Sequence, residues 1–104
     1  IYERGGVVGA VCHGYCGLLD TRLSDGSHLV AGRSITGFSW REEVLAGVDK
    51  LVPYNVEERM KERGARYSKA LLPFVSNVVV DGRLVTGQNP GSAKDTAAKV
   101  AALL

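Results

Sequence analysis

The chain of 104 residues is poor in the residues that metal sites and disulfide frameworks require. It has only two cysteines and two histidines, and the cluster of Cys12, His13 and Cys16 lacks the second ligand pair that a structural zinc site needs. Cys12 is expected just before the helix that contains Cys16, so the spacing does not favour a disulfide either. We therefore expect no metal, and we expect Cys16 to pack against the interior.

Long runs of one kind of residue are also missing. The 13 Lys and Arg are interspersed with 11 Asp and Glu, which gives a net charge of +2 and no electrostatic footprint for nucleic acid or a membrane surface. No stretch approaches the about 18 consecutive apolar residues of a membrane-spanning helix, and the N-terminus has no signal-peptide pattern. The sequence predicts no nucleic-acid partner, no membrane partner and a cytoplasmic location.

Internal repeats, linkers and nucleotide-binding loops are absent as well. The glycines of the Gly5–Gly9 segment come before or within a predicted strand, whereas the glycines of a dinucleotide loop lie between a strand and a helix. With 45% hydrophobic and 23% charged residues, the composition is that of an ordinary globular domain. The sequence thus predicts one domain at most, with no nucleotide site.

The most informative feature present is the apolar run Val7–Val11, which ends in Cys12, His13 and Gly14. This pattern is typical of a buried strand and a sharp turn into a helix, a geometry that presents a nucleophilic side chain. A helix N-terminus favours a thiolate, so we expect a lowered pKa and fast alkylation for Cys12. The N–H of His13 would be one donor for a developing oxyanion. A cysteine that only packs is the alternative, but a directly following histidine favours the reactive thiol.

The rest of the chain predicts short strands and capped helices. An all-apolar strand such as Val7–Val11 is typical of the middle of a parallel sheet, and we expect its partner strands to lie outside this chain. The residues before this strand resemble the end of a helix, which indicates a fragment. The other expected elements are a helix over 14–20, extended segments at 29–30, 34–36 and 66–68, helices from Ser39 to Gly47 and from Asn55 to Gly64, a hairpin of 78–80 and 84–86, and a helix after Asn89 or Ser92.

Three blocks in this order resemble the C-terminal half of a ThiJ/PfpI superfamily protein, which is class I glutamine amidotransferase-like. The blocks are Ala10–Gly14, Ile35–Ser39 and Val85–Pro90, and the resemblance covers essentially the whole chain. The last two blocks point to the glyoxalase III branch, which includes heat-inducible stress chaperones. The resemblance implies an α/β, flavodoxin-like three-layer sandwich. Residues 1–104 would be the C-terminal portion of a single domain whose N-terminal half is missing.

The activity that the resemblance implies is that of a cofactor-independent glyoxalase III-like lyase, a D-lactate dehydratase. Such an enzyme converts methylglyoxal or a similar 2-oxoaldehyde to a 2-hydroxy acid through a nucleophilic cysteine. The full-length parent would be a homodimer that binds a small aldehyde, and this chain alone would be inactive. The alternatives are a redox-sensing stress chaperone or protein deglycase, and a cysteine peptidase of the PfpI type.

The resemblance also implies a catalytic triad of Cys12, His13 and Glu43. From the residues alone, Glu42 and Glu43 would be acids in the first turn of a helix, where they complement the helix dipole. Glu42 stands one position away from the expected acid, and the sequence leaves that register open. A further Glu, from the missing half, would move protons between substrate carbons. The family usually has Pro-Ala where this chain has Tyr15 and Cys16, so we expect a pocket of altered shape.

Overall fold

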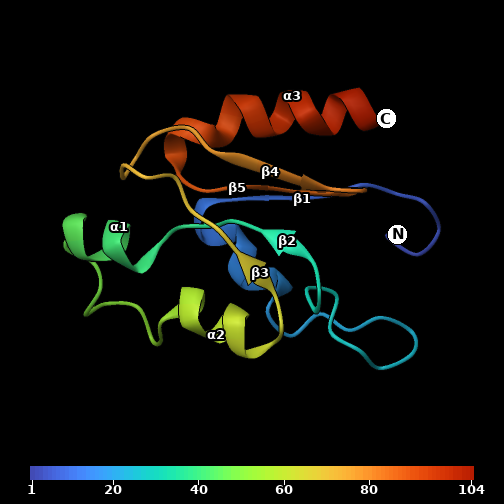
Figure 1. Cartoon of the computed structure of the whole chain (residues 1–104), viewed down its shortest axis with the longest axis horizontal. Coiled ribbons are helices and arrows are strands. Elements are labelled where there is room, and N and C mark those ends of the chain that lie inside the picture. The colour runs from blue at the N-terminus through green and yellow to red at the C-terminus, as the bar shows by residue number, and fades with distance from the viewer.

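A computed structural model of the chain, which describes residues 1–104, places a three-stranded sheet between two layers (Figure 1). The strands are β1 (Val8–Val11), β5 (Leu84–Gly87) and β4 (Val78–Asp81), in the order β1-β5-β4. β5 lies in the centre and all four of its residues are buried. The fold is therefore mixed α/β around a short sheet, consistent with the C-terminal part of a three-layer sandwich.

The pairing of β1 corrects one expectation. β1 pairs in parallel with β5, with Val8 opposite Leu84, so one partner strand is supplied by this chain. The other edge of β1 has no partner within residues 1–104. The sequence could not show this pairing because the two strands lie at opposite ends of the chain.

The β4–β5 hairpin forms where the Asp-Gly signal predicts it. Asp81 pairs with Leu84, and Gly82 between them adopts a φ of 59°, which a glycine reaches without steric cost. The Asp81 carboxylate accepts a hydrogen bond of 2.8 Å from the Ser34 N–H. This bond ties the hairpin to the layer below the sheet.

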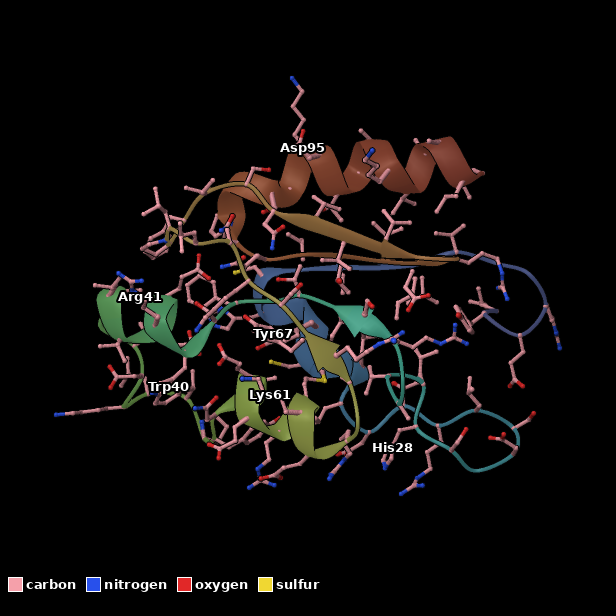
Figure 2. All side chains as sticks on the ribbon, viewed as in Figure 1. His28, Trp40, Arg41, Lys61, Tyr67 and Asp95 are labelled. Atoms are coloured by element: carbon pink, nitrogen blue, oxygen red, sulfur yellow. The ribbon has the colours of Figure 1, made fainter.

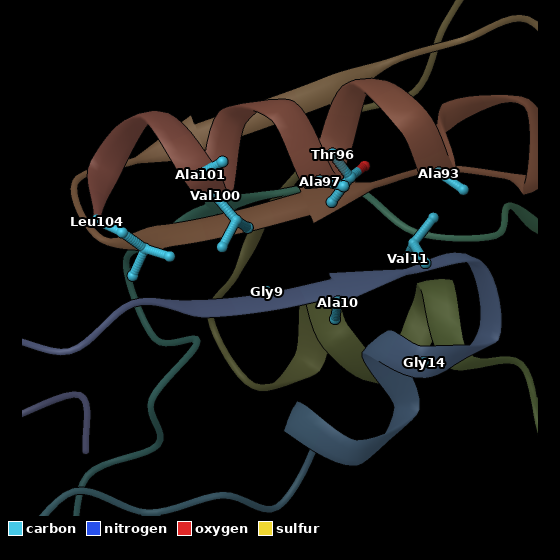
Figure 3. Close-up of a pocket in the computed structure, with 10 residues that line it drawn as sticks. All are labelled: Gly9, Ala10, Val11, Gly14, Ala93, Thr96, Ala97, Val100, Ala101 and Leu104. Atoms are coloured by element: carbon cyan, nitrogen blue, oxygen red, sulfur yellow. The ribbon is translucent and has the colours of Figure 1, made fainter.

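One helix forms the layer above the sheet. After a 3₁₀ turn, η2 (Pro90–Ser92), the helix α3 (Ala93–Leu103) runs back over β1 and β5. It passes close to the end of β5, where a Cβ on Gly87 would lie 2.1 Å from the Thr96 hydroxyl. Between α3 and the open edge of β1 lies an apolar groove of about 670 Å³ (Figure 3).

The layer below the sheet carries the remaining elements. It contains the parallel pair β2 (Ser34–Ile35) and β3 (Arg66–Tyr67), the helices α1 (Trp40–Leu45) and α2 (Val56–Glu62), and the 3₁₀ helix η1 (Cys12–Leu18). Figure 2 shows Tyr67 inside this layer, whereas Asp95 lies on the outer face of α3. None of the helices is long and apolar enough to cross a membrane.

Both capped helices confirm the sequence signals. Ser39 and Glu42 form a full capping box at the start of α1, and the Asn55 side chain accepts the Glu58 N–H at the start of α2. Beyond α2, Gly64 has a φ of 86°, the left-handed conformation in which glycine ends a helix.

Two local expectations were wrong. Leu29 and Val30 form a turn rather than an extended segment, because both side chains are drawn into the core below the sheet. The helix after the cysteine is also shifted: η1 is a 3₁₀ helix that begins at Cys12 itself, not an α-helix over 14–20. The signal at Leu29 and Val30 came from apolar content, which burial explains as well as regular structure does. The expectation of a helix over 14–20 came from its position after the turn at Cys12.

Candidate functional site

The site begins at Cys12, where β1 turns into η1. Val11 is still extended, but Cys12 has a φ of 58°, a left-handed conformation that a residue with a Cβ seldom adopts. Strain of this kind persists where the surrounding structure fixes it, and it is the geometry of a nucleophile elbow. The backbone N–H of His13 lies next to the Cys12 thiol and favours its thiolate form.

The imidazole of His13 stands between a thiol and a carboxylate. Its Nδ1 lies 3.9 Å from the Cys12 Sγ, and its Nε2 lies 2.5 Å from Oε1 of Glu43. The Glu43 side chain is only 5% exposed, whereas that of His13 is 49% exposed. The structure thus brings together all three residues of the triad that the sequence analysis expects, with the acid buried and the imidazole open to a substrate.

The sequence left open whether Glu42 or Glu43 contacts His13, and the position of α1 decides between them. The helix starts at the Ser39 cap, and this start directs Glu43 towards His13. Glu42 is fully buried, and its carboxylate accepts hydrogen bonds from Ser39 and Gln88 instead. Glu43 is therefore the carboxylate that contacts the imidazole, and Glu42 forms a separate set of hydrogen bonds.

The expected lowering of the Cys12 pKa is wrong for this structure. Burial raises the pKa of the thiol, the His13 N–H lowers it less, and the negative charges of Glu42 and Glu43 raise it further. The reason is that the fold buries part of the thiol and brings two carboxylates near it, and the single N–H of His13 offsets only part of these effects. A thiol with a raised pKa is protonated at neutral pH, so its activation requires a base, and His13 is in place.

Two aromatic side chains that the sequence analysis did not assign complete the site. The Phe38 ring packs on the His13 imidazole, with 4.6 Å between ring centroids. Phe74 packs edge-on against Phe38 at 5.9 Å, and its backbone φ is 61°. The Gly-Phe-Ser block pointed to Phe38, but no sequence signal pointed to Phe74. The imidazole is thus held from one side by an aromatic pair.

The backbone before α1 is fixed by two tyrosines. The Tyr15 hydroxyl donates to the Phe38 carbonyl at 2.8 Å, and the Tyr67 hydroxyl donates to the Gly37 carbonyl at 2.9 Å. Burial raises the pKa of both Tyr15 and Tyr67, so both remain protonated donors. Tyr15, a departure from the family pattern, is fully buried and packs against Gly37.

We expect Gly37→Ala to destabilise the protein by about 1–3 kcal/mol, the usual cost of overpacking a core. The added Cβ would lie 2.1 Å from the Tyr15 ring, which has no room to move. Urea unfolding of the full-length variant measures the loss. Gly17→Ala is the matched control, since nothing lies within 4 Å of its added Cβ. Equal midpoints for the two variants would contradict the close packing.

Within residues 1–104, the cysteines and the other potential metal ligands form neither a metal-binding cluster nor a disulfide bridge. No group of three or more His, Cys, Asp or Glu side chains is arranged to hold a metal ion. Both cysteines are free, and Cys16 is half-buried against the hydrophobic core, as expected. Burial also raises the pKa of the Cys16 thiol. Of the two cysteines, Cys12 is the one that lies beside an imidazole.

Comparison with known proteins identifies a family and relatives of similar sequence. The DJ-1/PfpI family model matches residues 1–103. The chain is 43% identical over 106 residues to the glutathione-independent glyoxalase HSP31 of Saccharomyces cerevisiae, covering 95% of this chain and 44% of that protein. It is 38% identical to glyoxalase 3 of Candida albicans, covering 98% of this chain and 45% of that protein.

Solved structures give the same result. The crystal structure of glyoxalase III from Candida albicans superposes with a TM-score of 0.92 at 36% identity, over 99% of this chain and 45% of that one. The Rapid Encystment Protein 24 KDa of Francisella tularensis also gives 0.92, at 37% identity, over 100% of this chain and 46% of that one. The chain therefore spans less than half the length of these relatives.

Proposed function

The chain belongs to the DJ-1/PfpI family, and on this premise we propose that it carries the nucleophilic centre of a glutathione-independent glyoxalase. The full-length protein would convert methylglyoxal, or a similar 2-oxoaldehyde, to a 2-hydroxy acid without a cofactor. The relatives named as glyoxalases, at 38–43% identity, support this activity. Cys12, His13 and Glu43 are the residues we assign to it.

One observation carries the proposal: the strained Cys12 presents its thiol to an imidazole whose other nitrogen is bound to a buried carboxylate. Nucleophilic cysteines are activated by a base, and the base is oriented by a third group. Here the distances are 3.9 Å from Sγ to Nδ1 and 2.5 Å from Nε2 to Oε1 of Glu43. This arrangement supports covalent chemistry on a small electrophile.

The reaction can be followed atom by atom. His13 takes the Cys12 proton, and the sulfur adds to the aldehyde carbon to form a hemithioacetal. The backbone N–H of His13, the residue directly after the nucleophile, would help to hold the oxyanion. A proton then leaves the former aldehyde carbon, and another joins the neighbouring carbon through an enediol, which leaves a thioester. Water hydrolyses the thioester, releases the 2-hydroxy acid and restores the thiol.

The enediol step needs a further carboxyl, which we place outside these residues. We propose that residues 1–104 are the C-terminal portion of one domain and that the preceding part supplies this carboxyl and a second oxyanion donor. The open edge of β1 and the apolar groove beside it support this proposal, as do relatives more than twice as long.

The activity is tested with the purified full-length protein and methylglyoxal, without glutathione, by measuring lactate. We expect lactate to form in the presence of a chelator. Propanal is the control substrate, because it has no adjacent carbonyl and cannot pass through an enediol. Absence of lactate, or a requirement for glutathione, would overturn the proposed function.

We expect residues 1–104 alone to form no lactate and to aggregate. Unpaired N–H and C=O groups along β1 and an uncovered apolar groove would be exposed to other chains. A circular dichroism melt and the lactate assay on the isolated chain, beside the full-length protein, measure both effects. A cooperative monomeric transition with lactate formation that depends on Cys12 would contradict the division of the site between two halves.

We also propose that the full-length protein is a cytoplasmic homodimer with no nucleic-acid or membrane partner. The interspersed charges and the family resemblance support this assignment. Light scattering of the purified protein and fractionation of the source cells are the tests. A monomeric mass, or recovery of the protein in the membrane fraction, would overturn the corresponding part.

A further inference from the structure

Glu42 is a buried carboxylate that the proposed mechanism does not use. Its side chain is fully buried, yet it makes no ion pair with Lys, Arg or His. Burying a charge without compensation is costly, so a position of this kind requires an explanation. Its compensation comes entirely from neutral donors.

Five hydrogen bonds converge on the two oxygens of this carboxylate. Oε1 accepts from the Ser39 N–H at 3.0 Å, the Ser39 hydroxyl at 2.9 Å and the Gln88 amide at 2.8 Å. Oε2 accepts from the Phe74 N–H at 2.7 Å and the Asn89 amide at 2.9 Å. Three segments that are distant in sequence therefore meet at one side chain: the start of α1, the loop at Phe74, and the turn after β5.

The charge is essential to this arrangement. Burial on its own would raise the pKa of Glu42, but the bonds from Gln88, Ser39, Phe74 and Asn89 together lower it, so the side chain stays ionised. A glutamine has a single acceptor oxygen, and its NH₂ group would face at least two donors. No neutral residue of this size can satisfy all five donors.

Two of the three bonded segments lead to the His13 imidazole. Ser39 caps the helix whose next residue after Glu42 is Glu43, bound to Nε2 of His13. The Phe74 N–H fixes a residue at a φ of 61°, and its ring packs on Phe38, which packs on His13. The carboxylate thus determines where two of the groups around the imidazole lie.

We propose that Glu42 is a positioning residue: its carboxylate holds α1 and the Phe74 loop in the arrangement that places Glu43 and Phe38 against His13. It acts through those residues and does not touch the substrate. The kinetic part of this inference rests on the proposed glyoxalase function, whereas its structural part does not.

The first measurement is kinetic and uses the full-length protein. Glu42→Gln should lower kcat for methylglyoxal about tenfold or more, the scale of loss that small misplacements of catalytic groups cause, with KM changed less. Glu58→Gln is the matched control, an exposed glutamate in the first turn of α2, and should leave kcat unchanged within about twofold.

The second measurement reads the placement of Glu43 without any substrate. In proton NMR of the full-length protein, the Nε2 proton that His13 shares with Glu43 should give a low-field signal. This signal should disappear in Glu43→Gln, and also in Glu42→Gln if Glu42 positions Glu43. It should persist in Glu58→Gln.

A double-mutant cycle then separates positioning from general destabilisation. If Glu42 acts through Glu43, adding Glu43→Gln to the Glu42→Gln variant should lower kcat by less than about threefold, far below its effect in the unmodified protein. Multiplicative losses, with the NMR signal intact in Glu42→Gln, would overturn the proposal.

A milder variant covers the case in which Glu42→Gln does not fold. Asn89→Ala removes one of the five donors to Glu42, together with the bonds of Asn89 to Val75 and Ser92, and keeps the Ser39 cap of α1. It should weaken the NMR signal and lower kcat to a smaller extent. An unchanged signal and kcat in that variant would overturn the proposal. If the unmodified protein makes no lactate, the proposed function fails, and the NMR comparison still decides the role of Glu42.

Discussion

Replacing Cys12 with serine in the full-length protein is expected to lower methylglyoxal turnover by at least about 10³-fold, as loss of a nucleophile does in other enzymes. A serine hydroxyl is far harder to deprotonate than a thiol, and the imidazole beside it cannot compensate for that difference. The lactate assay at saturating methylglyoxal measures the loss directly.

Cys16→Ser is the matched control for this experiment. Both cysteines lie on the same 3₁₀ helix and pack against the core, but Cys16 has no imidazole partner. Its turnover should stay within about threefold of the unmodified protein, as for a substitution away from the reacting groups. Equal losses in the two variants would show that the elbow does not select the reacting thiol.

The second large effect is expected for Glu43→Gln, which should lower kcat about 10²-fold with a smaller change in KM. The substitution keeps the shape of the side chain but removes the charge that stabilises a protonated His13. Because the raised pKa of Cys12 leaves proton transfer to His13 as the route to the thiolate, this charge acts on the step that starts the reaction.

An exposed glutamate at the start of α2 provides the control for this prediction. Glu58→Gln removes a charge of the same kind from an exposed helix start, and it should leave kcat unchanged. A kcat for Glu43→Gln close to that of the control would mean that the imidazole needs no carboxylate partner, despite the 2.5 Å contact.

The parts of the fold that the sequence predicted well are those with local causes. The capping box of Ser39 and Glu42, the Asn55 cap and the Gly82 turn all act within a few residues, so their patterns can be read directly. The pairing of Val8 with Leu84 has no local signal, because it depends on contacts across nearly the whole chain.

In the candidate site, too, some features could be predicted from the sequence and others could not. The resemblance pointed to Cys12, His13 and Glu43, and the structure brings these three residues together. The pKa of Cys12 could not be predicted, because it depends on burial and on carboxylates that only the fold brings near. The capping box predicted one contact of Glu42, but its bonds to Phe74 and Asn89 come from segments 32 and 47 residues away.

The pairing of β1 with β5 has a consequence for how the protein is made. During synthesis, the elbow at Cys12 leaves the ribosome well before Leu84, the residue that pairs with Val8. Contacts between such distant residues form slowly, because the loop between them must first lose its freedom. The Cys12 thiol therefore emerges on a strand whose β5 partner has not yet been synthesised, and β1 can form its pairing with β5 only after the residues of β5 have left the ribosome.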